Sequence, residues 1–203
     1  MNVHSLFYKG LTVKNSDKRS KIMKVALELL AEHGFHRVSM SMIAGKANVA
    51  VGTIYIYFAN KDKLIEELFL DLERKIVKTL LEGYPAESAI RDQFIFVTKK
   101  ILFYFLQNAI QFRYIEQYIN SPYGVMMHRD RLLGKVGRED MFINLFAEGV
   151  AKRIIKNIPV AVLFSVSFAP LIFLVRDHIL GFITLDDALI DKVTEACWDG
   201  IKR

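Results

Sequence analysis

The segment of residues 39–61, SMSMIAGKANVAVGTIYIYFANK, constrains the fold most, because its residue order predicts two short helices joined by a tight turn. Ser39 is a favourable N-cap for the first helix. The residues predicted to face inward from this helix are Met42, Ile43 and Ala47. Asn48 then ends the helix, because asparagine tolerates the left-handed backbone that such a turn requires, and Val49 supplies an apolar contact between the helices.

A second helix is predicted to start directly after this turn. Ile54 and Phe58 fall on one of its faces at helical spacing and are expected to point into a core. A helix that enters the major groove of DNA, roughly 12 Å wide, needs a slim leading turn that carries hydrogen-bonding groups. Gly52 and Thr53 meet that demand.

Two tyrosines and a lysine complete the residues that the chemistry of this helix offers to DNA. Tyr55 and Tyr57 can give a hydroxyl to a phosphate or lay a ring against a thymine methyl, and Lys61 can bind a phosphate. DNA binding is therefore the leading hypothesis. On periodicity alone, the alternative is an ordinary helical hairpin inside an all-helical core.

The order of residues around this segment resembles the N-terminal domain of the TetR/AcrR family of transcriptional regulators. The resemblance covers about residues 16–64 and rests on Gly34-Phe35, Ser39, Ile43-Ala44, Val49, Gly52-Thr53-Ile54-Tyr55, Tyr57-Phe58 and Lys61. It implies a bacterial, non-enzymatic regulator with an all-α fold. Residues 1–60 would form a three-helix DNA-binding domain and residues 61–203 a helical ligand-binding and dimerisation domain.

The resemblance adds four candidate DNA-binding residues, which are Ser39, Ser41, Val51 and Ile56. Ser41 occupies a position where the family often has a longer, basic residue, and Ile56 a position where histidine is frequent. The predicted reading surface is therefore unusually apolar, which favours contacts with thymine methyls over contacts with phosphates. The same feature keeps open an alternative function, a helical adaptor or coactivator of this fold that acts through protein partners.

Basic residues are concentrated near the N-terminus. Residues 1–60 hold eight Lys and Arg against three Asp and Glu, so they carry +5 of the net charge of +6 of the whole chain. A basic excess confined to the segment with the helix-turn-helix indicates a polyanionic partner, here a double-stranded DNA operator. The alternative is a solvated basic helix face.

The rest of the chain has a helical pattern. Only four Pro and eleven Gly occur, and no alternation typical of strands stands out. We expect about nine helices, over residues 16–33, 39–46, 50–57, 61–82, 86–108, 110–119, 129–156, 159–180 and 185–202.

Residues 160–175 form a run of sixteen positions without a charged residue. The run is too short to span a bilayer and is interrupted by two serines and Pro170, so we expect no membrane span. A helix that is apolar all round is buried on both sides, which suits a subunit interface. The resemblance implies a homodimer built from the last two long helices, as the two half-sites of an operator require. Burial in a monomer core is the alternative.

An aromatic-rich region in the middle of the chain favours a small-molecule pocket, with a plain core as the alternative. Residues 94, 98, 101 and 105 form one helical stripe that mixes a single hydroxyl into an apolar wall. The resemblance implies that the helix after residue 61 contributes as well. The candidate ligand-binding residues are Phe69, Leu72, Phe94, Thr98, Ile101, Phe105, Tyr118, Phe142, Ser165 and Phe168. A lipophilic or aromatic ligand would suit them.

Catalytic and metal-binding patterns are not found in the sequence. The five histidines are scattered, and Cys197 is the single cysteine, so we expect no metal, no cofactor, no disulfide and a reducing cytoplasm. The sequence thus predicts a repressor that binds a palindromic operator as a homodimer and is released by a small ligand.

Overall fold

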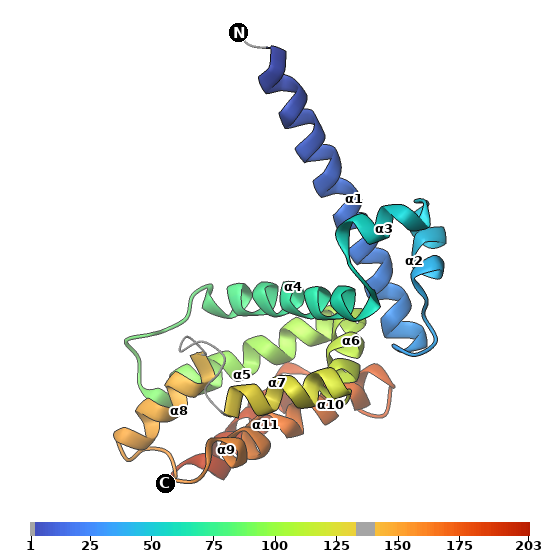
Figure 1. Ribbon diagram of the computed structural model, residues 1–203. Helices are drawn as coiled ribbons and strands as arrows, with labels where there is room; N and C mark the ends of the chain where they lie inside the picture. The colour runs from blue at the N-terminus through green and yellow to red at the C-terminus, as the bar shows by residue number, and fades with distance from the viewer. Residues whose placement is uncertain (1–2, 133–140) are drawn as a thin grey trace. The chain divides into compact units, whose positions relative to one another are not determined.

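The computed structural model describes residues 3–132 and 141–203, and the elements of this part are eleven α-helices (Figure 1). They are α1 (Val3–His33), α2 (Met40–Ala47), α3 (Val51–Tyr57), α4 (Lys61–Leu81), α5 (Ile90–Gln107), α6 (Ala109–Ile119), α7 (Pro122–Leu132), α8 (Met141–Ala151), α9 (Val160–Ser167), α10 (Ala169–Ile179) and α11 (Asp187–Ile201). The described residues contain one isolated antiparallel bridge, between Ile155 and Lys202, and no longer strand pairing. The all-α prediction is confirmed.

Three predicted helices have different ends in the structure. The helix expected over residues 16–33 already begins at Val3. The helix expected from residue 86 begins at Ile90, because residues 84–88 form turns in which Ala86 N donates to Tyr84 O. The helix expected over residues 129–156 is wrong at both ends, since α7 begins at Pro122 and α8 stops at Ala151, and residues 133–140 between them lie outside the described part.

The single helix predicted over residues 159–180 is two helices. The break falls at Phe168, which is both the C-cap of α9 and the N-cap of α10. Pro170 lies in the first turn of α10. Proline has no N–H to donate, and its ring clashes with the carbonyl group four residues earlier. It is therefore tolerated in the first turn of a helix but disrupts a helix interior.

The described residues pack into two compact units. The first comprises the residues up to Leu72 together with Ile110–Ser121, and the second comprises Glu73–Ala109 and Pro122–Arg203. In the first unit, α6 is hydrogen-bonded to α4 and α1: the hydroxyl of Tyr114 donates to Ile65 O at 2.6 Å, and the amide of Gln117 donates to Ala31 O at 2.9 Å.

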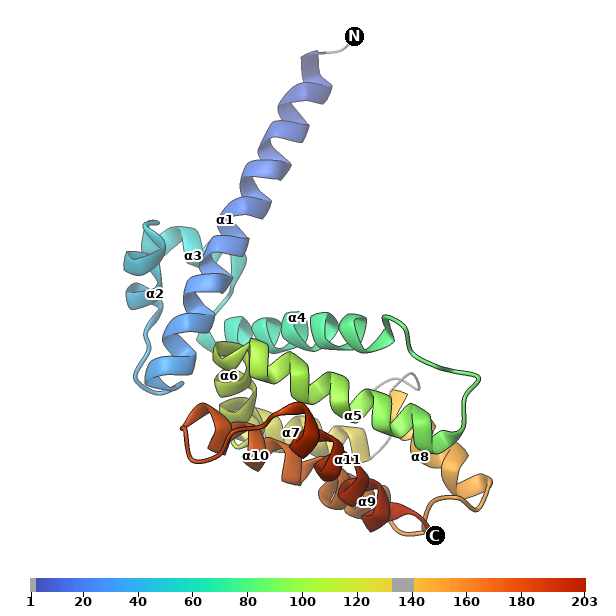
Figure 2. The same ribbon diagram turned by 180° about the vertical axis from the view of Figure 1, so that it is seen from behind.

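The second unit is built around α5, α9, α10 and α11, which lie side by side (Figure 2). Phe94 of α5 is fully buried, with its ring centroid 5.6 Å from that of Trp198 and 6.0 Å from that of Phe168. Val175 and Ile190 are buried in the same unit. These apolar contacts join helices that are distant in the sequence and supply the main driving force for folding.

Residues Val160–Ile179 are apolar enough, by length and composition, to count as a membrane-span candidate. A spanning helix needs about 20 continuous residues. The break at Phe168 divides this segment into α9 and α10, of 8 and 11 residues. Each helix alone is too short to cross a bilayer, and Leu163, Leu171 and Val175 are buried within the second unit. Only 22% of the segment is buried, so most of its side chains are exposed or partly exposed in the single chain.

The reactivity of the Cys197 thiol provides a test of the packing of this core. Cys197 is buried on α11, and burial raises the pKa of its thiol, so both access and thiolate content are low in the folded protein. We expect slow reaction with a chromogenic disulfide reagent at pH 8 under native conditions and fast reaction in denaturant. The chain has one cysteine, so the signal has a single source. Equal rates under both conditions would contradict the position of α11.

Candidate nucleic-acid interface

The turn between α2 and α3 has the geometry that the sequence predicts. The hydroxyl of Ser39 accepts a hydrogen bond from Met42 N at 3.2 Å and caps α2. At the other end Asn48 has φ 52° and ψ 52°, which is the left-handed region. Asn48 N donates to Gly45 O and Val49 N donates to Ala44 O at 3.0 Å, so the last carbonyls of α2 are satisfied.

The inner faces of the two helices meet in the core of the first unit. Ile43, Ala47, Ile54 and Phe58 are fully buried, as predicted. The inward position predicted for Met42 is wrong, because its side chain is 44% exposed. The buried residues of α2 are Met40, Ile43, Ala44 and Ala47, which follow the i, i+3, i+4, i+7 spacing of one helix face, and Met42 falls outside this face. Met40 fills that inward position instead, one turn before Ala44.

The outer face of α3 is exposed and largely apolar. Val51, Tyr55 and Ile56 are 43%, 51% and 77% exposed, although each carries a large side chain. A Cβ placed on Gly52 would meet nothing within 4 Å, so the backbone of the first turn is open to close approach. Thr53 and Tyr57 are half-buried at the sides of the helix. The outer face of α3 thus offers a partner the slim first turn at Gly52 and the exposed ring of Tyr55.

Lys61 is engaged inside the first unit. Its ammonium donates to Phe35 O at 2.9 Å and to Val38 O at 3.1 Å, and so it fixes the loop between α1 and α2 to the start of α4. An ammonium has three N–H donors. At most one donor of Lys61 is therefore left for the phosphate contact that the sequence predicts.

Two further basic residues near the α3 face have internal partners. Arg19 pairs with Glu67 at 2.7 Å, and its guanidinium lies 5.4 Å from the centre of the Phe58 ring. Lys46 pairs with Glu28 at 3.3 Å. These partners of Arg19 are distant in the chain, so no local sequence pattern predicts the pairing.

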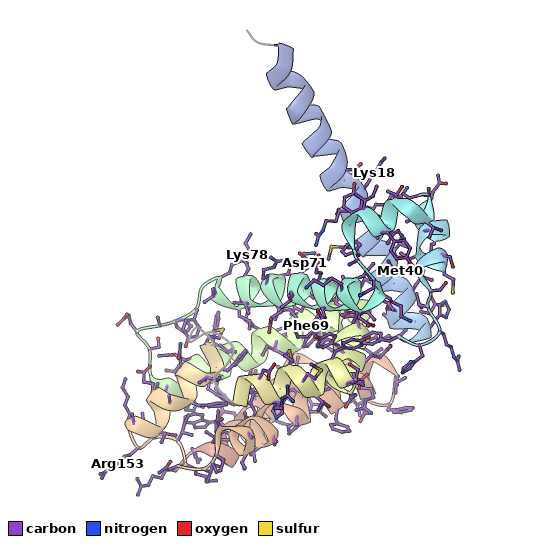
Figure 3. The ribbon with its side chains drawn as sticks, in the orientation of Figure 1. Lys18, Met40, Phe69, Asp71, Lys78 and Arg153 are labelled. Carbon is purple, nitrogen blue, oxygen red and sulfur yellow. The ribbon has the colours of Figure 1, made fainter. Side chains whose placement is uncertain are left out.

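Other cations of the first unit are exposed and free to meet a polyanion. They are Lys18, Lys21, Lys24 and Arg37, and Figure 3 shows Lys18 on α1. Ser41 is exposed as well, and its hydroxyl lies 2.8 Å from that of Ser39. The exposed basic residues supply a positive field around the α3 face, which suits a nucleic-acid backbone.

The candidate ligand-binding residues of the first unit fill its core. The rings of Phe69 and Tyr118 stack with centroids 3.9 Å apart, and Leu72 is buried (Figure 3). Stacked rings in direct contact leave no space for a third group between them. A ligand at this position would have to displace one of the rings.

The candidate ligand-binding residues of the second unit differ in exposure. Phe94, Thr98, Ile101 and Phe105 are buried, and the rings of Phe142 and Phe168 lie 4.9 Å apart. The hydroxyl of Thr98 donates to Phe94 O within its own helix. Ser165 is exposed, and its hydroxyl donates to Ala161 O.

Two cavities in the second unit are lined by other residues. The first has a volume of about 490 Å³ and is lined by Val150, Ala151, Arg153, Ile155, Lys156, Asn157 and Arg203. The second has a volume of about 210 Å³ and is lined by Ile143, Phe146, Ala147, Val150, Asn157, Ile158, Val160 and Leu163. None of these lining residues is among the ligand-binding residues predicted from the sequence, although the close spacing of Lys152, Arg153 and Lys156 is a sequence signal for an anion.

Comparison with known proteins identifies the family. Residues 22–68 match the model described as "Bacterial regulatory proteins, tetR family", and residues 89–202 match the model described as "Tetracyclin repressor-like, C-terminal domain". The chain belongs to the TetR family. It is a DNA-binding transcriptional regulator of the helix-turn-helix type and not an enzyme.

Similar proteins cover nearly the whole chain. A helix-turn-helix transcriptional regulator of Haemophilus influenzae is 25% identical over 188 residues, which are 93% of this chain and 97% of that protein. A solved TetR family protein of Vibrio parahaemolyticus is 31% identical, with a TM-score of 0.71 and coverage of 92% of this chain and 99% of that chain. The regulator FadR of Bacillus subtilis, solved in complex with stearoyl-CoA, is 21% identical, with a TM-score of 0.72 and coverage of 90% and 98%, and shares the fold.

The left-handed turn can be tested by substitution at Asn48. We expect Asn48→Val to lower the free energy of unfolding by about 1–2 kcal/mol, because a β-branched residue resists this backbone conformation. Asn48→Gly should be tolerated, since glycine adopts it without strain. Denaturant titration followed by circular dichroism measures both variants. Equal loss of stability in the two variants would mean that the side chain of Asn48, and not its backbone conformation, matters.

Proposed function

We propose that this regulator is a repressor that binds a palindromic operator as a homodimer and leaves it when a small lipophilic or aromatic ligand binds. The observation that carries the proposal is the exposed α3 face, where Val51, Tyr55 and Ile56 stand out from a helix whose opposite side is fully buried. Apolar side chains that are exposed together on one helix face are typical of an interaction surface. A DNA groove with thymine methyls matches their chemistry.

The proposed DNA contacts follow from the exposure of each side chain. Val51, Gly52, Tyr55 and Ile56 would face the bases, whereas Thr53 and Tyr57 at the sides of α3 would reach the sugar-phosphate backbone, as would Ser39 and Ser41. Most protein–DNA hydrogen bonds go to phosphates and fix the position of the protein, and base-edge contacts supply the specificity. An apolar reading face therefore favours operators with thymines at the contacted positions.

A homodimer is proposed on the basis of exposed apolar residues on α9 and α10. Val162 and Val166 lie four residues apart, on one side of α9, and Phe173 of α10 is also exposed. A Cβ on Gly200 would lie 2.7 Å from Val166 Cγ1, so α11 approaches α9 closely beside this surface. Two copies of such a surface can form an isologous interface, and a two-fold dimer reads two half-sites.

Ligand release is proposed as the regulatory step. It is supported by the aromatic core of both units and by the likeness of fold to a regulator solved with stearoyl-CoA. The candidate residues of the second unit, among which Phe94, Thr98, Ile101 and Phe105 are buried, remain the proposed site. A ligand that binds the DNA-free state more tightly than the DNA-bound state shifts the population toward release. The proposed location is the cytoplasm, where the operator is.

Substitution of Tyr55 tests the assignment of the reading helix. We expect Tyr55→Ala to weaken specific DNA binding by about 1 kcal/mol or more, the scale of a lost base contact. Tyr55→Phe is the matched control, because it keeps the ring and removes the hydroxyl. Fluorescence anisotropy with labelled DNA from upstream of the gene measures both. Unchanged binding by Tyr55→Ala would show that another surface reads the DNA.

The same titration, repeated with shuffled DNA and at two salt concentrations, tests the proposed function as a whole. A specific regulator prefers its own upstream DNA, and the affinity falls steeply with salt because bound phosphates release counterions. Weak and equal binding to both DNAs would favour the adaptor alternative.

The dimer is tested by introducing a charge on α9. We expect Val162→Glu to shift the protein from dimer to monomer in analytical ultracentrifugation, because an interface residue would then bury an unpaired carboxylate. Val125→Glu is the matched control, since Val125 is exposed on α7. If both variants sediment as the wild type does, the α9 surface is not the interface.

A further inference from the structure

The cavity of about 490 Å³ in the second unit is outside the residues so far assigned a function. It lies where the turn after α8 meets the end of α11, and three of its lining residues are basic: Arg153, Lys156 and Arg203. Its volume falls within the range of about 300–1,000 Å³ that is typical of small-molecule sites. Figure 3 marks Arg153 on this turn.

Main-chain hydrogen bonds hold the two segments of this cavity together. Lys156 N donates to Ile201 O and Arg203 N donates to Ile154 O, both at 2.9 Å. The Lys156 ammonium donates to Gly200 O at 2.7 Å, which leaves two of its three donors. In both ribbon views the end of the chain lies beside the connection between α8 and α9 (Figures 1 and 2). The basic side chains therefore start from a fixed backbone.

A close packing contact between Ile155 and Gly149 holds the turn that follows α8 in place. Ile155 is buried, and a Cβ added to Gly149 of α8 would overlap its side chain. Ile154 N and Ile155 N both donate to Gly149 O. The absence of a side chain at residue 149 thus allows the turn to fold back onto α8.

Arg153 has an unusual backbone conformation. Its φ is 59°, which is the left-handed region, where glycine is the usual residue at the end of a helix. The conformation costs about 1–2 kcal/mol for a residue with a Cβ. Backbone strain of this kind is concentrated at functional sites, so the left-handed Arg153 supports a functional role for this turn.

The neighbouring acids are already paired with other cations. Glu148 pairs with Lys152 at 2.5 Å, and Asp199 pairs with Lys202 at 2.7 Å. Among the described residues, Arg153, Lys156 and Arg203 have no acidic side chain as partner. The cavity thus keeps an excess of positive charge at neutral pH.

An apolar groove adjoins the basic cavity. The cavity of about 210 Å³ shares Val150 and Asn157 with it and continues along Phe146, Ile158 and Leu163. The basic cavity is open to solvent and continues into a short apolar groove. This arrangement matches a molecule with an anionic group at one end and a hydrocarbon chain at the other.

We propose that this double cavity binds a small amphiphilic anion, with its phosphate or carboxylate held by Arg153, Lys156 and Arg203 and its short alkyl chain lying between Phe146 and Leu163. Asn157, at the junction of the two cavities, offers an amide to the polar part. The site adjoins the proposed core site, since the ring of Phe146 lies 6.1 Å from that of Phe168, but none of its lining residues belongs to that site. The inference does not depend on the proposed repressor function.

Calorimetric titration with three probes tests the two parts of the site. Octyl phosphate carries both the anion and the chain, inorganic phosphate carries the anion alone, and 1-octanol carries the chain without the charge. We expect octyl phosphate to bind to the full-length protein at least about tenfold more tightly than either of the others. Equal binding of octyl phosphate and inorganic phosphate would overturn the role of the apolar groove, and equal binding of octanol that of the cations.

Arg153→Gly separates recognition from folding. The substitution removes a cation and relieves the left-handed strain, so the melting temperature should be equal or higher, while octyl phosphate should bind about tenfold less tightly, the scale of a lost charged hydrogen bond. Lys192→Ala is the control, because Lys192 is exposed on α11, does not line the cavity, and its substitution also removes one positive charge. Equal weakening in both variants would show attraction to net charge only and overturn the site. The wild-type DNA titration decides the repressor function separately.

Discussion

The left-handed backbone of Asn48 sets the direction in which α3 leaves α2, and the DNA-binding surface depends on it. Because the turn is this tight, Ile43 and Ile54 can enter the same core, and burial of Ile54 forces Tyr55 and Ile56 outward. The exposed apolar face of α3 is thus a geometric consequence of a buried one. A straighter connection would separate the two helices and expose both faces.

The basic residues of the first unit divide into two roles that charge counting does not distinguish. Arg19 and Lys61 are held by internal partners and fix α1, the following loop and α4 to one another. Lys18 and Arg37 are exposed and contribute to the field that a polyanion meets. The positive charge of this segment therefore stabilises the scaffold as well as favouring nucleic acid.

Local signals predicted the helix-turn-helix well, because they act within a few residues. The cap at Ser39, the turn at Asn48 and the spacing of Ile54 and Phe58 are fixed by short-range sterics and by period, and the structure has them all. Met42 was misplaced because neighbouring apolar residues look alike in a short helix. In the second unit, Phe168 could not be recognised as a helix junction from an apolar run that continues past it.

The all-α class, the helix-turn-helix and the family could be predicted from the amino-acid sequence, since each depends on residues close together in the chain. The contact of Lys61 with the α1–α2 loop, and the position of Arg153 at a basic cavity beside the end of α11, follow only from the three-dimensional packing. These contacts join segments many residues apart. Their partners are selected by the packing of whole helices, which no local pattern encodes.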